Sequence, residues 1–320
     1  MLSRVLVTGS TGFIGRHVAL RLAQKGSVVV AASRKSHLSL PEGVIGEVLP
    51  NLFRDISWDK VLRGVDTVIH CANYTPGFGE SVKSMELNYQ QVNVSGTQSL
   101  AVQSAEAGVR RFIYLSSIKV HGELSTPGNP VHELSQIAPV DAYARSKVAA
   151  EAALRLVGSE TSMSIVILRP PLVYGAGSKG NLASLMHWIK SGRPLPLGAI
   201  SDNRRSLISV ENLVDAITHC AEHPMASGQT FVVSDGEDIS TTTLLRAIGN
   251  AVGRDPRLIS VPPGLLRAAS TLAGQKQAAT RLLGSLQVDA RRIRGVTGWK
   301  PKMKLREGLQ SMADNIDKRG

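Results

Sequence analysis

The stretch VTGSTGFIG (residues 7–15) joins an apolar run to a helix-like segment and carries glycine at positions 9, 12 and 15. Gly9 allows a tight turn, Gly12 lets the backbone approach a diphosphate, and Gly15 lets the helix pack closely on the strand. The free N–H groups and the dipole at the start of a helix favour anions. The stretch therefore predicts a dinucleotide-binding loop.

Apolar runs and helix-like segments alternate through the first two-thirds of the chain. Near-continuous apolar runs are typical of parallel strands that are covered on both faces, and strands that alternate with helices build a doubly wound sheet. The expected strands are 4–9, 27–32, 66–72, 111–117 and 164–170, and the clearest helices are 13–26 and 142–157. We predict an α/β fold with a Rossmann-type doubly wound parallel sheet and a smaller, mostly helical C-terminal substrate domain.

The pattern changes after Arg169, where RPPLVYGAGSKGN (residues 169–181) is rich in Pro and Gly and predicts a loop. A late strand at 229–235 could return to the main sheet. Helices are expected at 182–191, 211–223, 241–252 and 305–317. We therefore expect a dinucleotide-binding domain at 1–170, rejoined by about 205–235, and a substrate-binding domain formed by 171–204 and 236–320.

The chain of 320 residues carries a formal charge of +12, and residues 254–320 hold 14 Lys/Arg against 5 Asp/Glu. These cations are dispersed and few aromatic residues are available for stacking, so nucleic acid is disfavoured. An anionic substrate or peripheral contact with an anionic membrane explains the charge better. No apolar run is long enough to span a membrane and no signal peptide is evident, which predicts a cytoplasmic protein. No metal site is expected, because only His219 and His223 have a helical spacing and no acidic partner lies between them.

The stretch VVVAASRKS (residues 28–36) ends the second expected strand with cations. Arg34 lies 19 residues past Gly15, where an acid would bind the 2′-OH of NAD. A forked guanidinium suits the 2′-phosphate of NADP instead, with Ser33 and Lys35 assisting. NADP(H) is therefore the preferred cofactor, and NAD(H) is the alternative.

The stretch YARSK places Tyr143 and Lys147 four residues apart, on one face of a helix. A nearby ammonium is expected to lower the pKa of the phenol, which makes Tyr143 a usable acid or base. Ser117, at the end of the strand FIYLSS, could hydrogen-bond a reacting oxygen. These three residues are the candidate catalytic group, and Ser116 is the runner-up to Ser117.

The chain resembles the extended short-chain dehydrogenases/reductases of the branch that acts on nucleotide sugars. Besides the glycine loop, Tyr143 and Lys147, the matching motifs are HCA (70–72), VNVSGT (92–97), LSSIKVHGE (115–123), LRPPLVYG (168–175), RRSLISVENLVDAI (204–217) and TGWKP (297–301). The resemblance implies that Tyr143 transfers the proton, Lys147 binds the nicotinamide ribose and Ser117 orients the sugar oxygen. It also suggests a homodimer.

The resemblance also suggests further contacts. The cofactor candidates are Gly9, Thr11, Gly12, Phe13, Ile14, Gly15, Ser33, Arg34, Asp55, Ala72, Asn93, Tyr143, Lys147 and Pro170. A structural role, holding backbone between strands, is equally open for Asn93. The substrate candidates are Tyr74, Ser117, Asn181, Arg205 and Arg281, with the two arginines expected at a diphosphate.

Three functions remain open. The first is an NADP(H)-dependent C4 reductase that converts a UDP-2-acetamido-2,6-dideoxy-4-hexulose to UDP-D-FucNAc or UDP-D-QuiNAc for surface polysaccharide (O-antigen); Arg34 favours it, because NADPH is a consumed reductant. The second is an NAD-dependent 4-epimerase of UDP-sugars such as UDP-GlcNAc or UDP-glucose, with the same active-site residues. The third is a non-catalytic dinucleotide sensor or RNA-binding relative, which would not need Tyr143 and Lys147.

Overall fold

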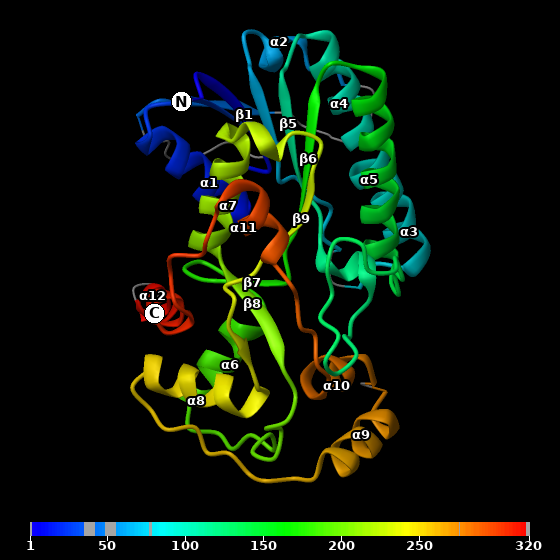
Figure 1. Ribbon diagram of the computed structural model, residues 1–320. Helices are drawn as coiled ribbons and strands as arrows, with labels where there is room; N and C mark the ends of the chain where they lie inside the picture. Colours follow the sequence, from blue (N-terminus) through cyan, green and yellow to red (C-terminus); the bar gives the residue numbers. More distant parts are fainter. Residues whose placement is uncertain (1, 35–41, 49–55, 77–78, 275, 318–320) are drawn as a thin grey trace.

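A computed structural model describes residues 2–34, 42–48, 56–76, 79–274 and 276–317. Its centre is a seven-stranded, wholly parallel sheet in the order β3-β2-β1-β4-β5-β6-β9 (Figure 1). The strands are β1 Arg4–Thr8, β2 Val28–Ser33, β3 Val44–Val48, β4 Thr67–His70, β5 Arg111–Leu115, β6 Ser164–Arg169 and β9 Thr230–Val232. The predicted doubly wound α/β fold is confirmed.

Helices cover both faces of this sheet (Figure 1), and each face has its own apolar core. Alternate strand residues are buried against α1, α7 and α11 on one face and against α2, α4 and α5 on the other. The bounds are α1 Phe13–Gln24, α7 Val210–Glu222, α11 Arg291–Thr297, α2 Asp59–Leu62, α4 Thr97–Glu106 and α5 Ala142–Glu160. Before α4 lie α3 Val82–Asn88 and the π-helix η1 Tyr89–Gly96, and the short 3₁₀ turns are η2 Ile118–His121 and η3 Pro224–Ala226.

A smaller lobe lies below the carboxyl edge of the large sheet in the view of Figure 1. It contains a three-stranded sheet in the order β10-β8-β7 and a separate apolar core that α6, α8 and α12 share. The bounds are β7 Leu172–Tyr174, β8 Arg205–Ser209, β10 Asp238–Ile239, α6 Asn181–Lys190, α8 Thr241–Ala251, α9 Pro263–Leu272, α10 Lys276–Leu283 and α12 Leu305–Asp317.

Two sequence expectations for this region need adjustment. The segment 169–181 is not wholly a loop, because β7 pairs in parallel with β8. Of the segment 205–235, β8 belongs to the small sheet, whereas α7 packs on the large sheet and β9 joins it beside β6. The chain therefore crosses between the two sheets more than once. No described helix has the length and hydropathy needed to cross a membrane.

Candidate active site

The three candidate catalytic residues lie together at the carboxyl edge of the large sheet. Ser117 follows β5 and begins η2, while Tyr143 and Lys147 lie in the first turns of α5. The side chain of Ser117 hydrogen-bonds the Tyr143 hydroxyl. The Lys147 ammonium lies 5.7 Å from the centre of the Tyr143 ring. The structure thus brings the predicted hydroxyl, phenol and ammonium into one cluster.

The Tyr143 phenol has a high pKa, contrary to the expectation from the sequence. Burial raises it to about 12, and the hydrogen bond from Ser117 only partly opposes this effect. The Lys147 ammonium lies under the ring and donates its hydrogen bond to the Leu115 carbonyl at 2.9 Å. Burial therefore outweighs the nearby ammonium, and the Tyr143 phenol keeps its proton at neutral pH until a reacting group or the charge of Lys147 favours its loss.

Lys147 is almost completely buried, with 3% of its surface exposed. Burial lowers the pKa of this ammonium to about 8, although Cys71 and Glu151 oppose the shift. A buried lysine with a pKa this close to neutrality can change protonation state during a reaction.

Ser116 makes a hydrogen bond inside the protein core and does not face the substrate cavity. Its hydroxyl donates to Glu151 at 2.5 Å, and Arg169 holds the same carboxylate through two bonds of 2.9 and 2.5 Å. All three residues are buried. This geometry favours Ser117 over Ser116 as the hydroxyl that faces the reacting oxygen.

The buried Glu151–Arg169 pair gives a stability prediction. Arg169→Met leaves a buried carboxylate without its main partner, so we expect the free energy of unfolding to fall by about 3–5 kcal/mol. The matched control is Arg155→Met, because Arg155 contacts the same carboxylate from a more exposed position; it should cost about 1 kcal/mol or less. Urea unfolding of both variants measures the difference, and equal losses would contradict the assignment.

The glycine loop forms a close-packed cradle at the start of α1. Gly9 has a φ of +68°, and a Cβ there would lie 2.8 Å from the backbone of Ala72. Gly12 caps α1 without a side-chain hydrogen bond, and its N–H donates to the Gly9 carbonyl at 2.8 Å. The uncapped N-terminus of α1 therefore fits a dinucleotide diphosphate.

Substitution of Gly15 tests how closely α1 packs against the glycine loop. A Cβ at this position would overlap the carbonyl oxygen of Gly9, so we expect Gly15→Ala to cost about 1–3 kcal/mol of stability and to weaken dinucleotide retention. Gly295→Ala is the control, since Gly295 lies in α11 with open space at its Cβ. Thermal unfolding should separate the two variants, and a fully stable Gly15→Ala protein would contradict this packing.

The other cofactor candidates lie around the same edge. Thr11 is exposed, Phe13 and Ile14 open α1, and Ala72 follows β4. Pro170 follows β6, and its carbonyl accepts the Ile118 N–H at 2.9 Å. These positions follow the ends of neighbouring parallel strands or begin the first helix, which is where ligands bind in such sheets.

The end of β2 places Ser33 and Arg34 at this edge as well. Ser33 is buried, whereas Arg34 is exposed and is close enough to Tyr74 for its charge to act on that phenol. Lys35 and Asp55 lie outside the described residues. Arg34 is therefore available to an anion.

Two candidates, Asn93 and Tyr74, make hydrogen bonds to other residues of the protein. Asn93 is buried in η1. Its side-chain oxygen Oδ1 accepts a hydrogen bond from the Tyr74 backbone N–H at 2.9 Å, and its side-chain nitrogen Nδ2 donates one to the Ser146 hydroxyl at 2.9 Å. This is the structural role that the sequence left open. Tyr74 points its hydroxyl at Glu80, and Asn88 donates to it at 3.2 Å, so it does not reach the substrate cavity described below.

Tyr89 is a site residue that the sequence did not single out. Its ring lies between Tyr74 and Tyr143, at centroid distances of 5.2 and 6.0 Å. It belongs to the π-helix η1, and π-helical turns often occur at functional sites. The π-helix gives no clear signal in the sequence, which explains the omission.

A cavity of about 1150 Å³ opens from Ser117 and Tyr143 into the small lobe. Leucines from β7, β8, α6 and α8 form much of its wall, and Asn181, Arg205 and Arg281 also line it. Arg205 donates to the carbonyls of Arg281 (2.5 Å) and Gly284 (3.0 Å). The Arg281 guanidinium donates to Glu123 at 2.6 Å. All substrate candidates except Tyr74 therefore meet at this cavity.

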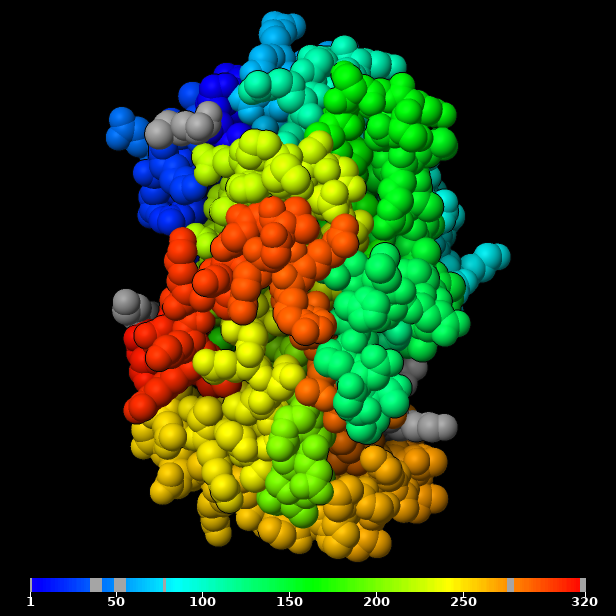
Figure 2. Space-filling model, viewed as in Figure 1, coloured from blue at the N-terminus to red at the C-terminus, as the bar shows by residue number. Residues whose placement is uncertain are grey.

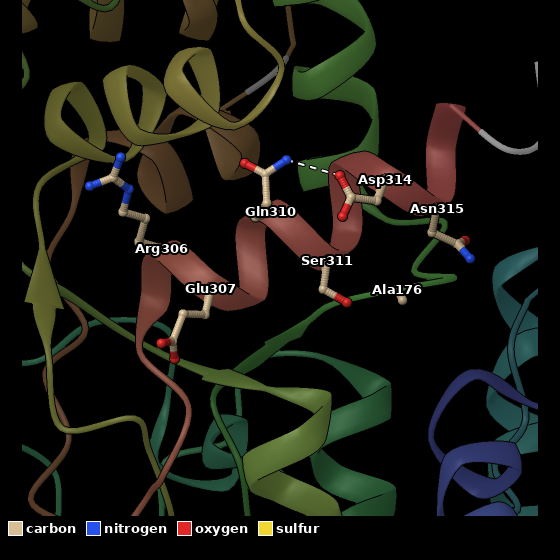
Figure 3. A pocket seen from close by; sticks show the side chains of 7 residues that line it. All are labelled: Ala176, Arg306, Glu307, Gln310, Ser311, Asp314 and Asn315. Atoms are coloured by element: carbon tan, nitrogen blue, oxygen red, sulfur yellow. Dashed lines mark hydrogen bonds between the residues drawn. The ribbon is translucent and has the colours of Figure 1, made fainter.

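A second cavity, of about 600 Å³, runs along α12 and lies apart from this cluster (Figure 3). Its lining residues are Ala176, Arg306, Glu307, Gln310, Ser311, Asp314 and Asn315. Gln310 donates to Asp314 at 2.9 Å. None of the candidate catalytic residues reaches it. Within the described part of the chain, no group of three His, Cys, Asp or Glu side chains could hold a metal ion.

Comparison with known proteins agrees with this architecture. UDP-glucose 4-epimerase of Vibrio cholerae is 38% identical over 309 residues, which cover 97% of this chain and 94% of that protein. The crystal structure of UDP-glucose 4-epimerase from Thermotoga maritima with UDP-glucose matches with a TM-score of 0.79 at 21% identity, over 99% of both chains. UDP-glucuronic acid 4-epimerase from Bacillus cereus, in complex with NAD, matches with a TM-score of 0.80 at 20% identity, over 98% of this chain and 99% of that one.

The family profile described as NAD dependent epimerase/dehydratase matches residues 5–234, which include the glycine loop, Ser117, Tyr143 and Lys147. The resemblance stated from the sequence is confirmed. The protein belongs to the NAD-dependent epimerase/dehydratase family.

Proposed function

We propose that the protein is a UDP-sugar 4-epimerase that works with a tightly held nicotinamide dinucleotide. The observation that carries this proposal is the Ser117–Tyr143–Lys147 cluster, which opens on a cavity containing Arg205 and Arg281. The 38% identity with a UDP-glucose 4-epimerase supports epimerisation over reduction. This choice reverses the order that Arg34 suggested in the sequence.

The residues of the cluster divide the chemistry at C4 of the sugar. The dinucleotide, when bound at the glycine loop, supplies the hydride acceptor and donor. When hydride leaves C4, Tyr143 in its phenolate form accepts the proton of the C4 hydroxyl, and it gives that proton back when hydride returns; Ser117 orients the C4 oxygen by a hydrogen bond. Lys147 stabilises the negative charge that develops on the phenol when its proton leaves. Because the hydride removed from C4 returns to C4 in the same catalytic cycle, no reductant is consumed.

Two arginines that line the cavity support a nucleotide diphosphate as part of the substrate. Arg205 and Arg281 supply guanidinium groups, which pair well with phosphate oxygens. Arg281 is bound to Glu123, so a diphosphate would share or replace that contact. Asn181, at the first turn of α6, is the proposed contact for the nucleoside.

The C4 reductase remains a second candidate because of Arg34, which is exposed at the end of β2 and suits the 2′-phosphate of NADP. Incubation of the purified protein with UDP-glucose or UDP-GlcNAc, without added coenzyme, separates the two. The epimerase produces the C4 epimer with no net change in coenzyme absorbance. The reductase instead consumes NADPH stoichiometrically with a UDP-4-keto-6-deoxy-GlcNAc and leaves both UDP-sugars unchanged.

We further propose that the protein is a homodimer, as the family resemblance implies, and that it acts in the cytoplasm. Light scattering coupled to gel filtration tests the dimer, and a monomer at micromolar concentration would contradict it.

A further inference from the structure

Lys119 brings a second ammonium to the catalytic cluster. It lies in η2, two residues after Ser117, and its backbone N–H donates to the Ser117 hydroxyl at 3.2 Å. Its ammonium lies 5.8 Å from the centre of the Tyr143 ring, about as far as the Lys147 ammonium on α5, at 5.7 Å. Lys119 also lines the substrate cavity, with 28% of its side chain exposed. It therefore adjoins both the hydroxyl and the phenol of the candidate catalytic group.

The carboxylate of Asp141 opposes negative charge on the Tyr143 phenol. Asp141 caps α5, where one of its oxygens accepts the Ala144 backbone N–H at 2.7 Å. Burial is the main cause of the raised pKa of the Tyr143 phenol, and the charge of Asp141 adds to it. The Lys119 ammonium donates to the other oxygen of Asp141 at 2.7 Å. Beside the phenol, the ammonium and the carboxylate therefore offset each other's charge.

Two more side chains close this arrangement into a ring. Glu123 lies 3.4 Å from the Lys119 ammonium and 2.6 Å from the Arg281 guanidinium, which in turn lies 3.9 Å from Asp141. These four residues, which we call the charge ring, alternate in sign and have no net charge. In Figure 2 the blue-green segment that follows η2 reaches the orange segment that contains α10. The charge ring thus joins the start of the catalytic helix α5 to the small lobe.

Titratable groups from η1 and β5 also face the Tyr143 phenol. Tyr89 lies against its ring at a centroid distance of 6.0 Å, and Tyr114 is close enough for its charge to interact with Tyr143. Burial raises the pKa of both phenols, so they are uncharged at neutral pH. The charged groups that the structure places against the ring are Lys147, Lys119 and Asp141.

We propose that Lys119 is a positioning residue of the reaction, which neutralises Asp141 and stabilises negative charge on the Tyr143 phenol during proton transfer. The proposal rests on the role assigned to Tyr143 under the proposed function. Without the ammonium, the charge of Asp141 would face the phenol unbalanced, and the phenol would ionise less readily. Lys119→Met should therefore lower kcat at pH 7 by about tenfold, and the loss should diminish as pH rises.

An absorbance titration that needs no turnover tests the proposal. Nitrotyrosine incorporated at position 143 of the full-length protein supplies a phenol that ionises near neutral pH, where Lys119 carries its charge, and whose ionised form absorbs visible light. Lys119→Met should raise the pKa of this phenol by about one unit, and Lys119→Arg, which keeps the charge, should restore most of the shift. Asp141→Asn keeps a residue that caps helices well and should lower the pKa. Combined with Lys119→Met, it should return the pKa close to that of the protein with both natural residues.

The matched control is Lys302→Met, because Lys302 forms an ion pair of 2.9 Å with Asp215 and does not line the substrate cavity; it should leave the phenol pKa unchanged. An unchanged pKa in Lys119→Met, or a raised pKa that Asp141→Asn does not reverse, would overturn the proposal and leave the ion pair a purely structural role. If the natural protein converts no UDP-sugar but the titration gives the expected shifts, the proposed function fails while the charge compensation by Lys119 stands.

Discussion

Tyr143→Phe is expected to lower kcat for sugar conversion by roughly 10²–10⁴-fold while leaving the fold intact. The phenol is the group of the cluster to which we assign the transfer of the C4 hydroxyl proton, because it lines the cavity beside Ser117. Its hydroxyl bonds Ser117, and both groups line the substrate cavity, so removal leaves no orphaned core contact. Coupled assays of kcat and KM, with circular dichroism of the variant, measure both effects.

Tyr114→Phe provides the matched control for the loss of a phenol hydroxyl. The Tyr114 ring lies 4.8 Å from the Lys147 ammonium, and its buried hydroxyl has no hydrogen-bond partner among the described residues. We expect activity within about threefold of the natural protein and unchanged or slightly higher stability. If Tyr143→Phe keeps full activity, the non-catalytic interpretation returns, and if both variants lose activity equally, the phenol of Tyr143 has no special role.

Lys147→Met is expected to abolish most activity and to change how stability depends on pH. The ammonium has a pKa of about 8 in the folded chain, below its ordinary value of 10.5. The folded state therefore disfavours the charged form, a cost that is fully present below pH 8. The cost is relieved as pH rises from 8 toward 10.5, because the unfolded chain then binds more protons than the folded one. Relative to Lys147→Met, the natural protein should gain about 2–3 kcal/mol between pH 7 and pH 10.

Denaturant unfolding of both proteins at several pH values measures this difference, in which the titration of groups remote from Lys147 cancels. Lys60→Met serves as the control, because Lys60 is exposed and, among the described residues, pairs with Glu47 at the surface; it should change stability by less than about 1 kcal/mol at each pH. A flat difference for Lys147→Met would show that the ammonium is not held in a desolvating site.

Local patterns in the sequence were sufficient for much of the fold and site. The glycine loop has its predicted turn, the Tyr143–Lys147 spacing gives one helix face, and Ser117 follows β5 as expected. The predicted strands and helices differ from the observed ones by only a few residues at their ends. These features depend on short-range periodicity and on the common edge of parallel strands.

What the sequence did not predict depends on contacts between distant segments. The Glu151–Arg169 pair, the Arg281–Glu123 contact and the position of Tyr89 join residues that local periodicity cannot relate. The Tyr143 pKa also differs from the sequence-based prediction, because burial outweighs the effect of the nearby cation. β7 lies where the sequence predicts a loop, since a three-residue strand amid Pro and Gly has almost no periodic signal.

Epimerisation of UDP-glucose carrying deuterium at C4 tests the central claim most directly. If the hydride that leaves C4 returns to C4 in the same cycle, the product epimer should keep the deuterium at C4 without added coenzyme. NMR of the product measures the position of the label. An epimer with the label lost to solvent, or no epimer alongside NADPH-dependent reduction of a 4-keto sugar, would contradict the account.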